Sequence, residues 1–291
     1  MKKELNNKTA LITGATQGLG KEIAIHFVKE GANVILCARD LQKLEDIKSK
    51  LKKIQSHSQV ILSKVVDVSL EVDIQNLTKF TFDNCKTCEI LINNAGIYGP
   101  KGKFEEINIK DWLNTIDINF IGSAMLCHYF LPFFKKQNYG KIIQLSGGGA
   151  TKPMPNISGY AASKAAIVRL IETLAEENKG YNIDINSVAP GSLNTGMLDE
   201  ILISGSSKVG EEYFTKALKQ KADGGESFEK ALSLITFLAS SKSDGISGKL
   251  ISAIWDDWER WPKHKKKLLD SDVYTLRRII GKDRKMNWGD K

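Results

Sequence analysis

Tyr160 and Lys164 are the residues of this sequence whose types and spacing most directly suggest chemistry. Four residues apart in a helix, their side chains project from one face, one turn apart. A free tyrosine has a pKa near ~10 and exchanges protons poorly at neutral pH, but a nearby ammonium favours the phenolate. Such a tyrosine could protonate a carbonyl oxygen as hydride arrives at the carbon, or deprotonate an alcohol in reverse. The same spacing also occurs by chance on exposed helix faces, so the pair needs support from the rest of the chain.

A glycine-rich turn supplies that support. The segment TGATQGLG, residues 13–20, lies between a predicted strand (9–13) and a predicted helix (21–30). In a dinucleotide-binding turn, Gly14 would make the tight turn, Gly18 would let the backbone approach a pyrophosphate, and Gly20 would allow close helix packing. The helix N-terminus then offers free N–H groups and the positive end of its dipole to the phosphates. Glycines alone could mark a plain turn, but their place between a strand and a helix predicts a dinucleotide site.

The end of the second predicted strand indicates which dinucleotide is preferred. NAD sites usually place a carboxylate there to hold the ribose 2′-hydroxyl, whereas NADP sites place a cation there for the 2′-phosphate. Here Ala38 occupies the position of the acid, and Arg39 follows it. A guanidinium suits bidentate pairing with a phosphate, so NADP(H) is favoured over NAD(H). The alternative is that Arg39 is a solvated charge paired with Asp40.

A framework of alternating strands and helices must position these residues. Apolar strands that alternate with helices argue for a parallel sheet covered on both faces. With no linker or repeat to divide it, the segment 1–253 is predicted to form one domain, followed by an extension at 254–291. Strands are predicted at 9–13, 33–38, 60–66, 89–93, 141–145, 183–188 and 248–253, and helices at 21–30, 41–54, 72–82, 111–134, 159–178 and 228–239.

Four motifs together resemble those of the short-chain dehydrogenase/reductase family. They are TGATQGLG, the sequence NNAG at 93–96 after the fourth strand, the Tyr160/Lys164 pair, and Pro190-Gly191 after the sixth strand. The similarity covers about residues 8–253. It implies an α/β fold with a single Rossmann-type doubly wound domain, whose mainly parallel seven-stranded sheet is flanked by helices. It also implies an NAD(P)-dependent oxidoreductase that interconverts a small-molecule ketone and a secondary alcohol, as a homodimer or homotetramer.

The resemblance implies catalytic roles at matching positions. Tyr160 would be the acid/base, Lys164 would lower its pKa and hold the nicotinamide ribose, and Asn119 would hold a water that links Lys164 to solvent. The family also uses a hydroxyl to orient the substrate carbonyl, usually a serine 13 residues before the tyrosine, a position that Gly147 occupies here. Ser146 precedes it, so either the loop delivers Ser146 to the usual place or the role is shared or lost. The plain alternative is a strand-end serine that caps the next turn.

The resemblance also implies a set of cofactor contacts. Asp67 would contact the adenine amino group, Asn93 would line the adenine side, and Thr195 would hold the nicotinamide carboxamide or a phosphate. The complete set of implied cofactor-binding residues is Thr13, Gly14, Thr16, Gln17, Gly18, Leu19, Gly20, Arg39, Asp67, Val68, Asn93, Ala95, Gly96, Tyr160, Lys164, Pro190, Gly191 and Thr195.

The region after Thr195 suits a lid over the substrate. Two glycine-containing stretches, 204–207 and 223–225, flank a predicted helical piece around 211–219. Glycines on both sides of a helix favour a hinged element that closes over a bound substrate.

The extension at 254–291 is basic and rich in tryptophan. Trp255, Trp258 and Trp261 recur every third residue, the lysine-rich stretch 263–267 follows, and a short helix is predicted at 272–280. Three interpretations stay open. The extension could be a wall over the active site whose cations favour an anionic substrate, an arm at a subunit interface, or a surface appendage whose lysines face water.

Composition excludes several classes of protein. The formal net charge is +8, and half of it lies in 255–291, where eleven Lys/Arg face seven Asp/Glu. That basic patch is too small to predict nucleic-acid binding.

No apolar run approaches the ~20 residues of a membrane span, and the N-terminus lacks a signal peptide, which predicts a cytoplasmic protein without a membrane partner. Cys85 and Cys88 lack further ligands for zinc, and no metal site is predicted.

Two rival functions use the same fold. A non-catalytic NADP(H)-binding or sensing protein would keep the dinucleotide site without turnover, and the displaced Ser146 is its only support. A sugar-nucleotide-modifying member would turn over substrate without net consumption of cofactor.

Overall fold

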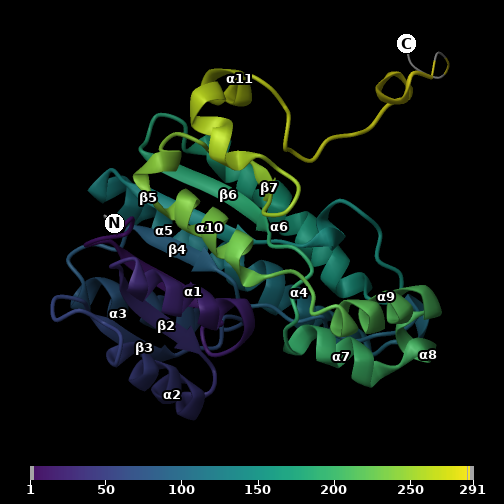
Figure 1. Ribbon diagram of the computed structural model, residues 1–291, viewed down its shortest axis with the longest axis horizontal. Helices are drawn as coiled ribbons and strands as arrows, with labels where there is room; N and C mark the ends of the chain where they lie inside the picture. Colours follow the sequence, from purple (N-terminus) through teal and green to yellow (C-terminus); the bar gives the residue numbers. More distant parts are fainter. Residues whose placement is uncertain (1–2, 287, 289–291) are drawn as a thin grey trace.

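Seven parallel strands form the central sheet of the computed structural model, which describes residues 3–286 and 288. The strand order is β3-β2-β1-β4-β5-β6-β7, so the chain winds from the middle of the sheet to one edge, crosses back, and winds to the other (Figure 1). The winding changes direction between β1 and β4, and in open α/β sheets ligands bind beyond the carboxyl ends of the strands at such a point. The predicted doubly wound α/β fold is confirmed. The strands are β1 (Thr9–Thr13), β2 (Asn33–Ala38), β3 (Ile61–Val65), β4 (Ile90–Asn93), β5 (Gly140–Leu145), β6 (Ile183–Ala189) and β7 (Leu250–Ser252).

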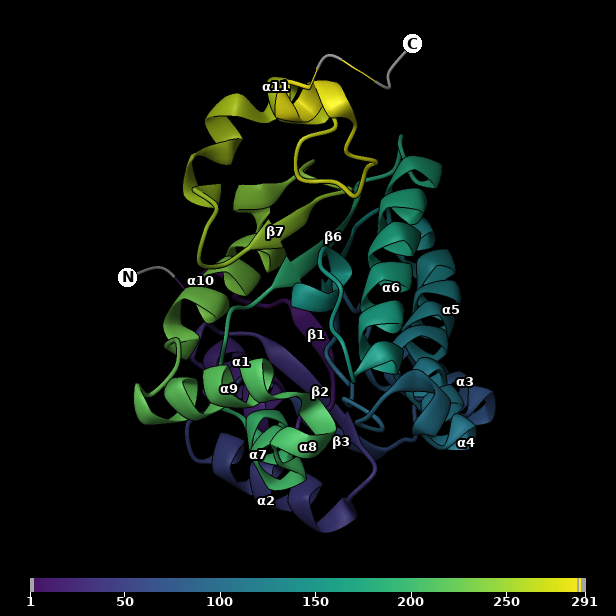
Figure 2. The same cartoon turned by 90° about the vertical axis from the view of Figure 1, so that its right-hand side faces the viewer.

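Helices cover both faces of this sheet. In β1, Ala10 and Ile12 face one core and Leu11 faces the other, because successive side chains of a strand point to opposite faces. Helices α1, α2 and α10 cover the first core, and α3, α5 and α6 cover the second (Figure 2). The helices are α1 (Gly18–Lys29), α2 (Leu41–Lys52), α3 (Glu71–Asn84), α4 (Ile109–Ile116), α5 (Gly122–Gln137), α6 (Ser158–Glu177), α7 (Gly196–Ser204), α8 (Ser206–Val209), α9 (Glu211–Ala222), α10 (Phe228–Ala239) and α11 (Lys265–Leu269).

The helix predicted at 111–134 is interrupted by a wider turn. Helix α4 continues through a π-helical turn, Asp117–Ile121, directly into α5. A Cβ on Gly122 would lie 2.4 Å from the carbonyl oxygen of Val68, so only glycine lets the helix pass this close to the chain after β3. Single π turns inside helices often occur at functional sites, and this one carries Asn119.

Helices α7, α8 and α9 form a cover with a small core of its own. Leu198, Ile201 and Ala217 are among the buried residues of that core. Gly205 and Gly210 separate the three helices and have φ values of 75° and 85°, a conformation that favours glycine. The helical piece predicted at 211–219 corresponds to α9, whereas α7 and α8 were not predicted.

The first part of the C-terminal extension packs onto the domain. Trp258 and Trp261 lie on a 3₁₀-helix, Trp258–His264, and both are buried in the first core together with Leu268. Their spacing of three matches the three residues per turn of a 3₁₀-helix, so both side chains point to one side. The Trp258 ring lies 5.2 Å from that of Phe237 in α10. This part of the extension therefore shares the core of the domain.

The helix predicted at 272–280 is not formed. The N–H of Leu250 in β7 donates to the carbonyl oxygen of Tyr274 at 2.8 Å, and Lys249 Nζ donates to that of Val273 at 3.1 Å. Tyr274 also has a positive φ of 59°, which a right-handed helix does not allow. Carbonyl groups that a helix would pair internally are instead bound by the backbone of β7 and by the side chain of Lys249, the residue before it. The chain then runs away from the body toward its C-terminus (Figure 1).

Within the described residues, no helix is both long enough and apolar enough to cross a membrane. That same part of the chain contains no group of three or more His, Cys, Asp or Glu that could hold a metal ion. Cys85 and Cys88 are unpaired, and burial raises the pKa of both thiols, which disfavours the reactive thiolate.

Candidate active site

A cavity of about 1020 Å³ lies at the carboxyl ends of the strands. The turn after β1, the ends of β2, β5 and β6, and the cover of α7 and α9 surround it. Four predicted site residues do not line it: Thr13, Gly20, Asn93 and Asn119. Those that do are Gly14, Thr16, Gln17, Gly18, Leu19, Arg39, Asp67, Val68, Ala95, Gly96, Ser146, Tyr160, Lys164, Pro190, Gly191 and Thr195.

The turn after β1 has glycines in positive-φ conformations and leads directly into the N-terminus of α1. Gly14 and Gly18 have φ values of 63° and 52°, which glycine adopts at little cost. A Cβ on Gly20 would lie 2.3 Å from the carbonyl oxygen of Gly14, so a side chain at this position would push the helix away from the turn. The side chain of Gln17, the N-cap residue of α1, makes no cap hydrogen bond, which leaves the first N–H groups of the helix available to an anion. These features fit the pyrophosphate of a dinucleotide.

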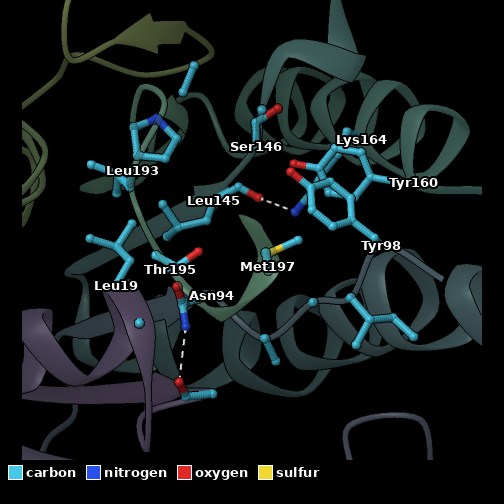
Figure 3. A pocket seen from close by; sticks show the side chains of 18 of the residues that line it. Leu19, Asn94, Tyr98, Leu145, Ser146, Tyr160, Lys164, Leu193, Thr195 and Met197 are labelled. Atoms are coloured by element: carbon cyan, nitrogen blue, oxygen red, sulfur yellow. Dashed lines mark hydrogen bonds between the residues drawn. The ribbon is translucent and has the colours of Figure 1, made fainter. Parts of the chain in front are cut away.

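Asn94 ties this turn to the neighbouring strand, and the sequence reasoning missed it. Its Nδ2 donates to the carbonyl oxygens of Thr13 and Gly14 at 2.9 and 3.2 Å (Figure 3). The Thr13 hydroxyl accepts from the N–H groups of Asn94 and Ala95 at 2.9 and 3.0 Å. Thr13 therefore acts behind the cavity wall, by fixing the two loops that form it.

Asn93 does not lie where the resemblance implied. It is buried in β4, and its Nδ2 donates to the carbonyl oxygen of Ser123 and to the sulfur of Cys127, both in α5. Successive side chains of a strand point to opposite faces, so Asn93 faces α5 while Asn94 reaches the cavity. The signal was present in the sequence, because the alternation of β4 settles which asparagine is on which side.

The end of β2 presents an unpaired guanidinium to the cavity. Asp40 caps α2 by accepting from the N–H of Lys43 at 3.0 Å, and it pairs with Lys43 Nζ at 3.6 Å. Among the described residues Arg39 has no ion-pair partner, and the alternative pairing of Arg39 with Asp40 does not form. Arg39 is exposed and lines the cavity beside Ala38.

Two more predicted residues stand at the cavity wall. Asp67 Oδ1 accepts from the N–H and the hydroxyl of Ser69 at 2.9 and 2.7 Å, which fixes this carboxylate. Thr195 faces the glycine turn, and a Cβ on Gly18 would lie 3.5 Å from that of Thr195.

Tyr160 and Lys164 project from one face of α6 into the cavity (Figure 3). Lys164 Nζ lies 5.5 Å from the centre of the Tyr160 ring and donates to the carbonyl oxygen of Leu145 at 2.9 Å. Burial lowers the pKa of Lys164 to about 8. Burial, and after it the neighbouring Tyr213, raises the pKa of Tyr160. Lys164 is not among the causes of this shift, so the structure does not show the lowering of the Tyr160 pKa that the resemblance implied.

Asn119 fixes the backbone beside this pair. Its Nδ2 donates to the carbonyl oxygen of Ile97 at 2.9 Å and to the hydroxyl of Ser163 at 3.0 Å, and its Oδ1 accepts from the N–H of Ile97 at 2.8 Å. A Cβ on Gly96 would lie 3.2 Å from Asn119 Oδ1 and 3.7 Å from Lys164 Nζ. Asn119 Oδ1 and Lys164 Nζ thus both lie close to Gly96, which lines the cavity.

Ser146 follows β5 but does not present its hydroxyl. Its N–H donates to the carbonyl oxygen of Val188 at 2.8 Å, which continues the pairing of β5 with β6. Its Oγ is completely buried and has no hydrogen-bond partner among the described residues. At the next position, a Cβ on Gly147 would lie 2.4 Å from the hydroxyl of Tyr160.

Two tyrosines, Tyr98 and Tyr213, line the cavity close to Tyr160, and the sequence reasoning identified neither. The ring of Tyr98 lies 4.7 Å from that of Tyr160 at an angle of 59°. Its hydroxyl is 3.4 Å from that of Tyr213, which comes from α9 in the cover. No motif marks them, because the folded chain brings together three positions that are far apart in the sequence.

Part of the C-terminal extension reaches the same cavity. Trp255, Asp256, Tyr274 and Thr275 line it near the ends of β6 and β7. None of the lysines at 263–267 is among the lining residues, and Lys265 Nζ donates instead to the carbonyl oxygen of Asp244 at 2.7 Å. Aromatic and polar groups, not the lysine cluster, form this wall.

A family profile and a sequence relative both match most of this chain. The profile of the short chain dehydrogenase family matches residues 8–204. The chain is 31% identical to the 3-oxoacyl-[acyl-carrier-protein] reductase FabG of Thermotoga maritima over 249 residues, 85% of this chain and 96% of the relative.

Solved structures share the fold. NAD+-bound xylitol dehydrogenase superposes with a TM-score of 0.78 at 24% identity, covering 86% of this chain and 98% of that one. The NADPH-dependent reductase YwfH superposes with a TM-score of 0.76 at 24% identity, covering 85% and 97%.

Proposed function

Because the chain belongs to the short-chain dehydrogenase/reductase family, it is an NAD(P)-dependent oxidoreductase of alcohol and carbonyl groups, and we propose that it interconverts a ketone and a secondary alcohol with NADP(H). One observation carries the proposal. Tyr160 and Lys164 lie together in a cavity that begins at the glycine turn.

The residues of the cavity wall would hold the cofactor. Backbone N–H groups at the start of α1 would bind the pyrophosphate, and Thr195 would hold the nicotinamide end. When bound, the nicotinamide supplies or accepts a hydride. The cavity would hold the reacting carbon of the substrate beside Tyr160. Proximity and orientation would then account for much of the rate enhancement.

Tyr160 would move the proton. Because burial raises its pKa, the phenol is neutral at physiological pH and is ready to protonate a carbonyl oxygen. In the reverse direction the phenol must lose its proton, and the ammonium of Lys164 on the same helix face would then stabilise the phenolate. Asn119 would hold a water that links Lys164 to solvent, through the side of Oδ1 that faces Gly96.

Several finer features belong to the same proposal. The unpaired Arg39 supports NADP(H) over NAD(H), and Lys152 on the cavity wall supports an anionic carbonyl substrate. The family resemblance supports a homodimer or homotetramer, and a cytoplasmic location is part of the same proposal. The extension at 254–291 is proposed as a wall of the substrate end, which its four lining residues support.

The test is Tyr160→Phe, which removes the hydroxyl and keeps the ring. We expect NADPH oxidation with a panel of carbonyl compounds to fall by about 10²- to 10⁴-fold, the usual contribution of a general acid. The Kd for NADPH, measured by fluorescence, should stay near the wild-type value. Unchanged turnover in the variant would refute the assigned mechanism. Wild-type binding of NADPH without turnover would indicate a sensing protein, and substrate conversion without net NADPH loss would indicate a sugar-nucleotide-modifying enzyme.

A further inference from the structure

The position that would carry a substrate-orienting serine has no room for a side chain while the phenol of Tyr160 lies where it does. A Cβ on Gly147 would lie 2.4 Å from the hydroxyl oxygen of Tyr160, far inside van der Waals contact. The φ and ψ values of Gly147 are 176° and 179°, extended backbone that any residue adopts. The glycine is therefore explained by space and not by backbone strain. Glycine at position 147 leaves the space that the phenol of Tyr160 occupies.

Ser146 does not replace the missing group in this arrangement. Its Oγ is buried, is without a partner among the described residues, and is held on a backbone paired with β6. Figure 3 shows Ser146 in the same cavity wall as Tyr98 and Tyr160, with no hydrogen bond from its hydroxyl to either phenol. A carbonyl oxygen that enters the cavity would therefore meet Tyr160 without help from β5 or the loop that follows it.

Tyr98 stands where a second donor is needed. Its ring packs at 4.7 Å against the ring of Tyr160, and it is partly exposed to the cavity. Burial, and after it Tyr213, raises the pKa of Tyr98, so its hydroxyl keeps its proton. Its charged neighbours, Lys101 and Glu200, pair with each other at 3.0 Å and leave no net charge beside the ring. Tyr98 is thus an uncharged hydrogen-bond donor beside Tyr160, the proposed general acid.

We propose that the hydroxyl of Tyr98, held by that of Tyr213, donates the second hydrogen bond to the substrate carbonyl oxygen and takes the orienting role of the missing serine. The inference rests on the proposed ketone reduction. In that step the carbonyl carbon gains the hydride and the carbonyl oxygen gains the proton of Tyr160. Tyr98 stays protonated and stabilises the negative charge that develops on the oxygen. The Tyr213 hydroxyl lies 3.4 Å from that of Tyr98, and either hydroxyl could donate. With substrate bound, Tyr213 would donate to Tyr98, which would leave the proton of Tyr98 free for the substrate.

This arrangement links catalysis to the cover. Tyr213 belongs to α9, whereas Tyr98 belongs to the loop between β4 and α4. Tyr98, Tyr213 and Phe214 all pack against the small core of the cover. The second donor is therefore held in place only while α7–α9 lie over the cavity. Tyr98 would be a catalytic residue, and Tyr213 a positioning residue.

The first test compares Tyr98→Phe with Ser146→Ala in the full chain, using NADPH and a carbonyl compound that the wild type reduces. Loss of one oxyanion donor commonly lowers kcat by about 10²- to 10³-fold, and we expect Tyr98→Phe to lower it at least tenfold. Ser146→Ala should lower kcat clearly less than Tyr98→Phe does. Tyr181→Phe removes the same hydroxyl group at an exposed position outside the cavity wall, and it should stay within about twofold of wild type. The Tm and the Kd for NADPH should not change in either variant, because neither loses a packing group. Full activity of Tyr98→Phe, or an equal loss in Ser146→Ala, would overturn the proposal.

The second test isolates Tyr213 with a double-mutant cycle. Tyr213→Phe keeps the ring in the cover, and we expect it to lower kcat about three- to tenfold with little change in KM. In the Tyr98→Phe background the same change should have almost no further effect, because the hydroxyl it positions is already gone. A purely structural role for Tyr213 would give additive losses and would refute the positioning role. If no carbonyl compound is reduced by the wild type although NADPH binds, the proposed function fails first and the inference with it.

Discussion

Arg39 is the residue on which the proposed preference for NADP(H) rests. Asp40 would neutralise it in the simplest interpretation of the sequence, but Asp40 is committed to the N-terminus of α2 and to Lys43. The guanidinium is thereby left at the cavity rim without an ion-pair partner among the described residues. Arg39 offers a planar fork of donors that matches a phosphate, and Ala38 offers nothing to a ribose hydroxyl.

Replacing Arg39 by alanine should weaken NADPH binding and spare NADH. A hydrogen bond to a charged group contributes roughly 1.5–3 kcal/mol, which corresponds to about 10- to 100-fold in Kd. Kd values for NADPH and NADH, measured by fluorescence titration, test this directly. Arg278→Ala is the matched control, since Arg278 is exposed and does not line the cavity. Equal NADPH affinity in wild type and Arg39→Ala would contradict the proposed preference.

Most of the site residues predicted from the sequence line the cavity, because the motifs lie in loops at strand ends that the parallel fold brings together. The prediction misplaced Asn93, since the motif has two adjacent asparagines and only the strand alternation separates their directions. It also missed Tyr98 and Tyr213, which no local pattern marks. The direction of the Tyr160 pKa shift was beyond it as well, since burial depends on every element packed around the phenol.

At the scale of elements, the π turn between α4 and α5 places Asn119 where a regular helix would not. Hydrophobic periodicity predicts that a segment is helical, but one extra residue in a turn leaves this signal nearly unchanged. The segment 111–134 was therefore correctly predicted as helical, but the π turn that carries Asn119 was not predicted. Through this turn the Asn119 amide reaches both backbone groups of Ile97 and the hydroxyl of Ser163 in α6.

Asn119→Ala should destabilise the fold as well as the site. It leaves the N–H and carbonyl of Ile97 without their partner, and each buried unsatisfied group costs about 1–3 kcal/mol. We expect the free energy of unfolding to fall by roughly 2–5 kcal/mol in urea denaturation. Asn114→Ala makes the same change at an exposed position of α4 and should stay within about 0.5 kcal/mol of wild type. Equal effects of the two changes would mean that the amide of Asn119 is not structural.

At the scale of the whole molecule, the sheet was predictable and the path of the extension was not. Parallel strands are buried on both faces, so their apolar runs stand out between helices, and the number of strands and their bounds follow closely. The extension carries no such pattern. Its tryptophans looked alike in sequence, yet Trp255 is 86% exposed whereas Trp258 is 8% exposed. Only the folded domain supplies the surface beside α10 that separates them.

This difference gives a prediction about what the extension contributes to stability. Trp258→Ala would leave a cavity beside Phe237 in the first core, and such a change typically costs about 3–5 kcal/mol. Trp255→Ala removes the same side chain from an exposed position, and its cost should stay within about 0.5 kcal/mol. Urea midpoints of the two variants, read by circular dichroism, compare them directly. If Trp258→Ala were as stable as Trp255→Ala, the extension would not be part of the core. A large loss in Trp258→Ala alone would mean that the domain depends on residues beyond 253 for its folding energy.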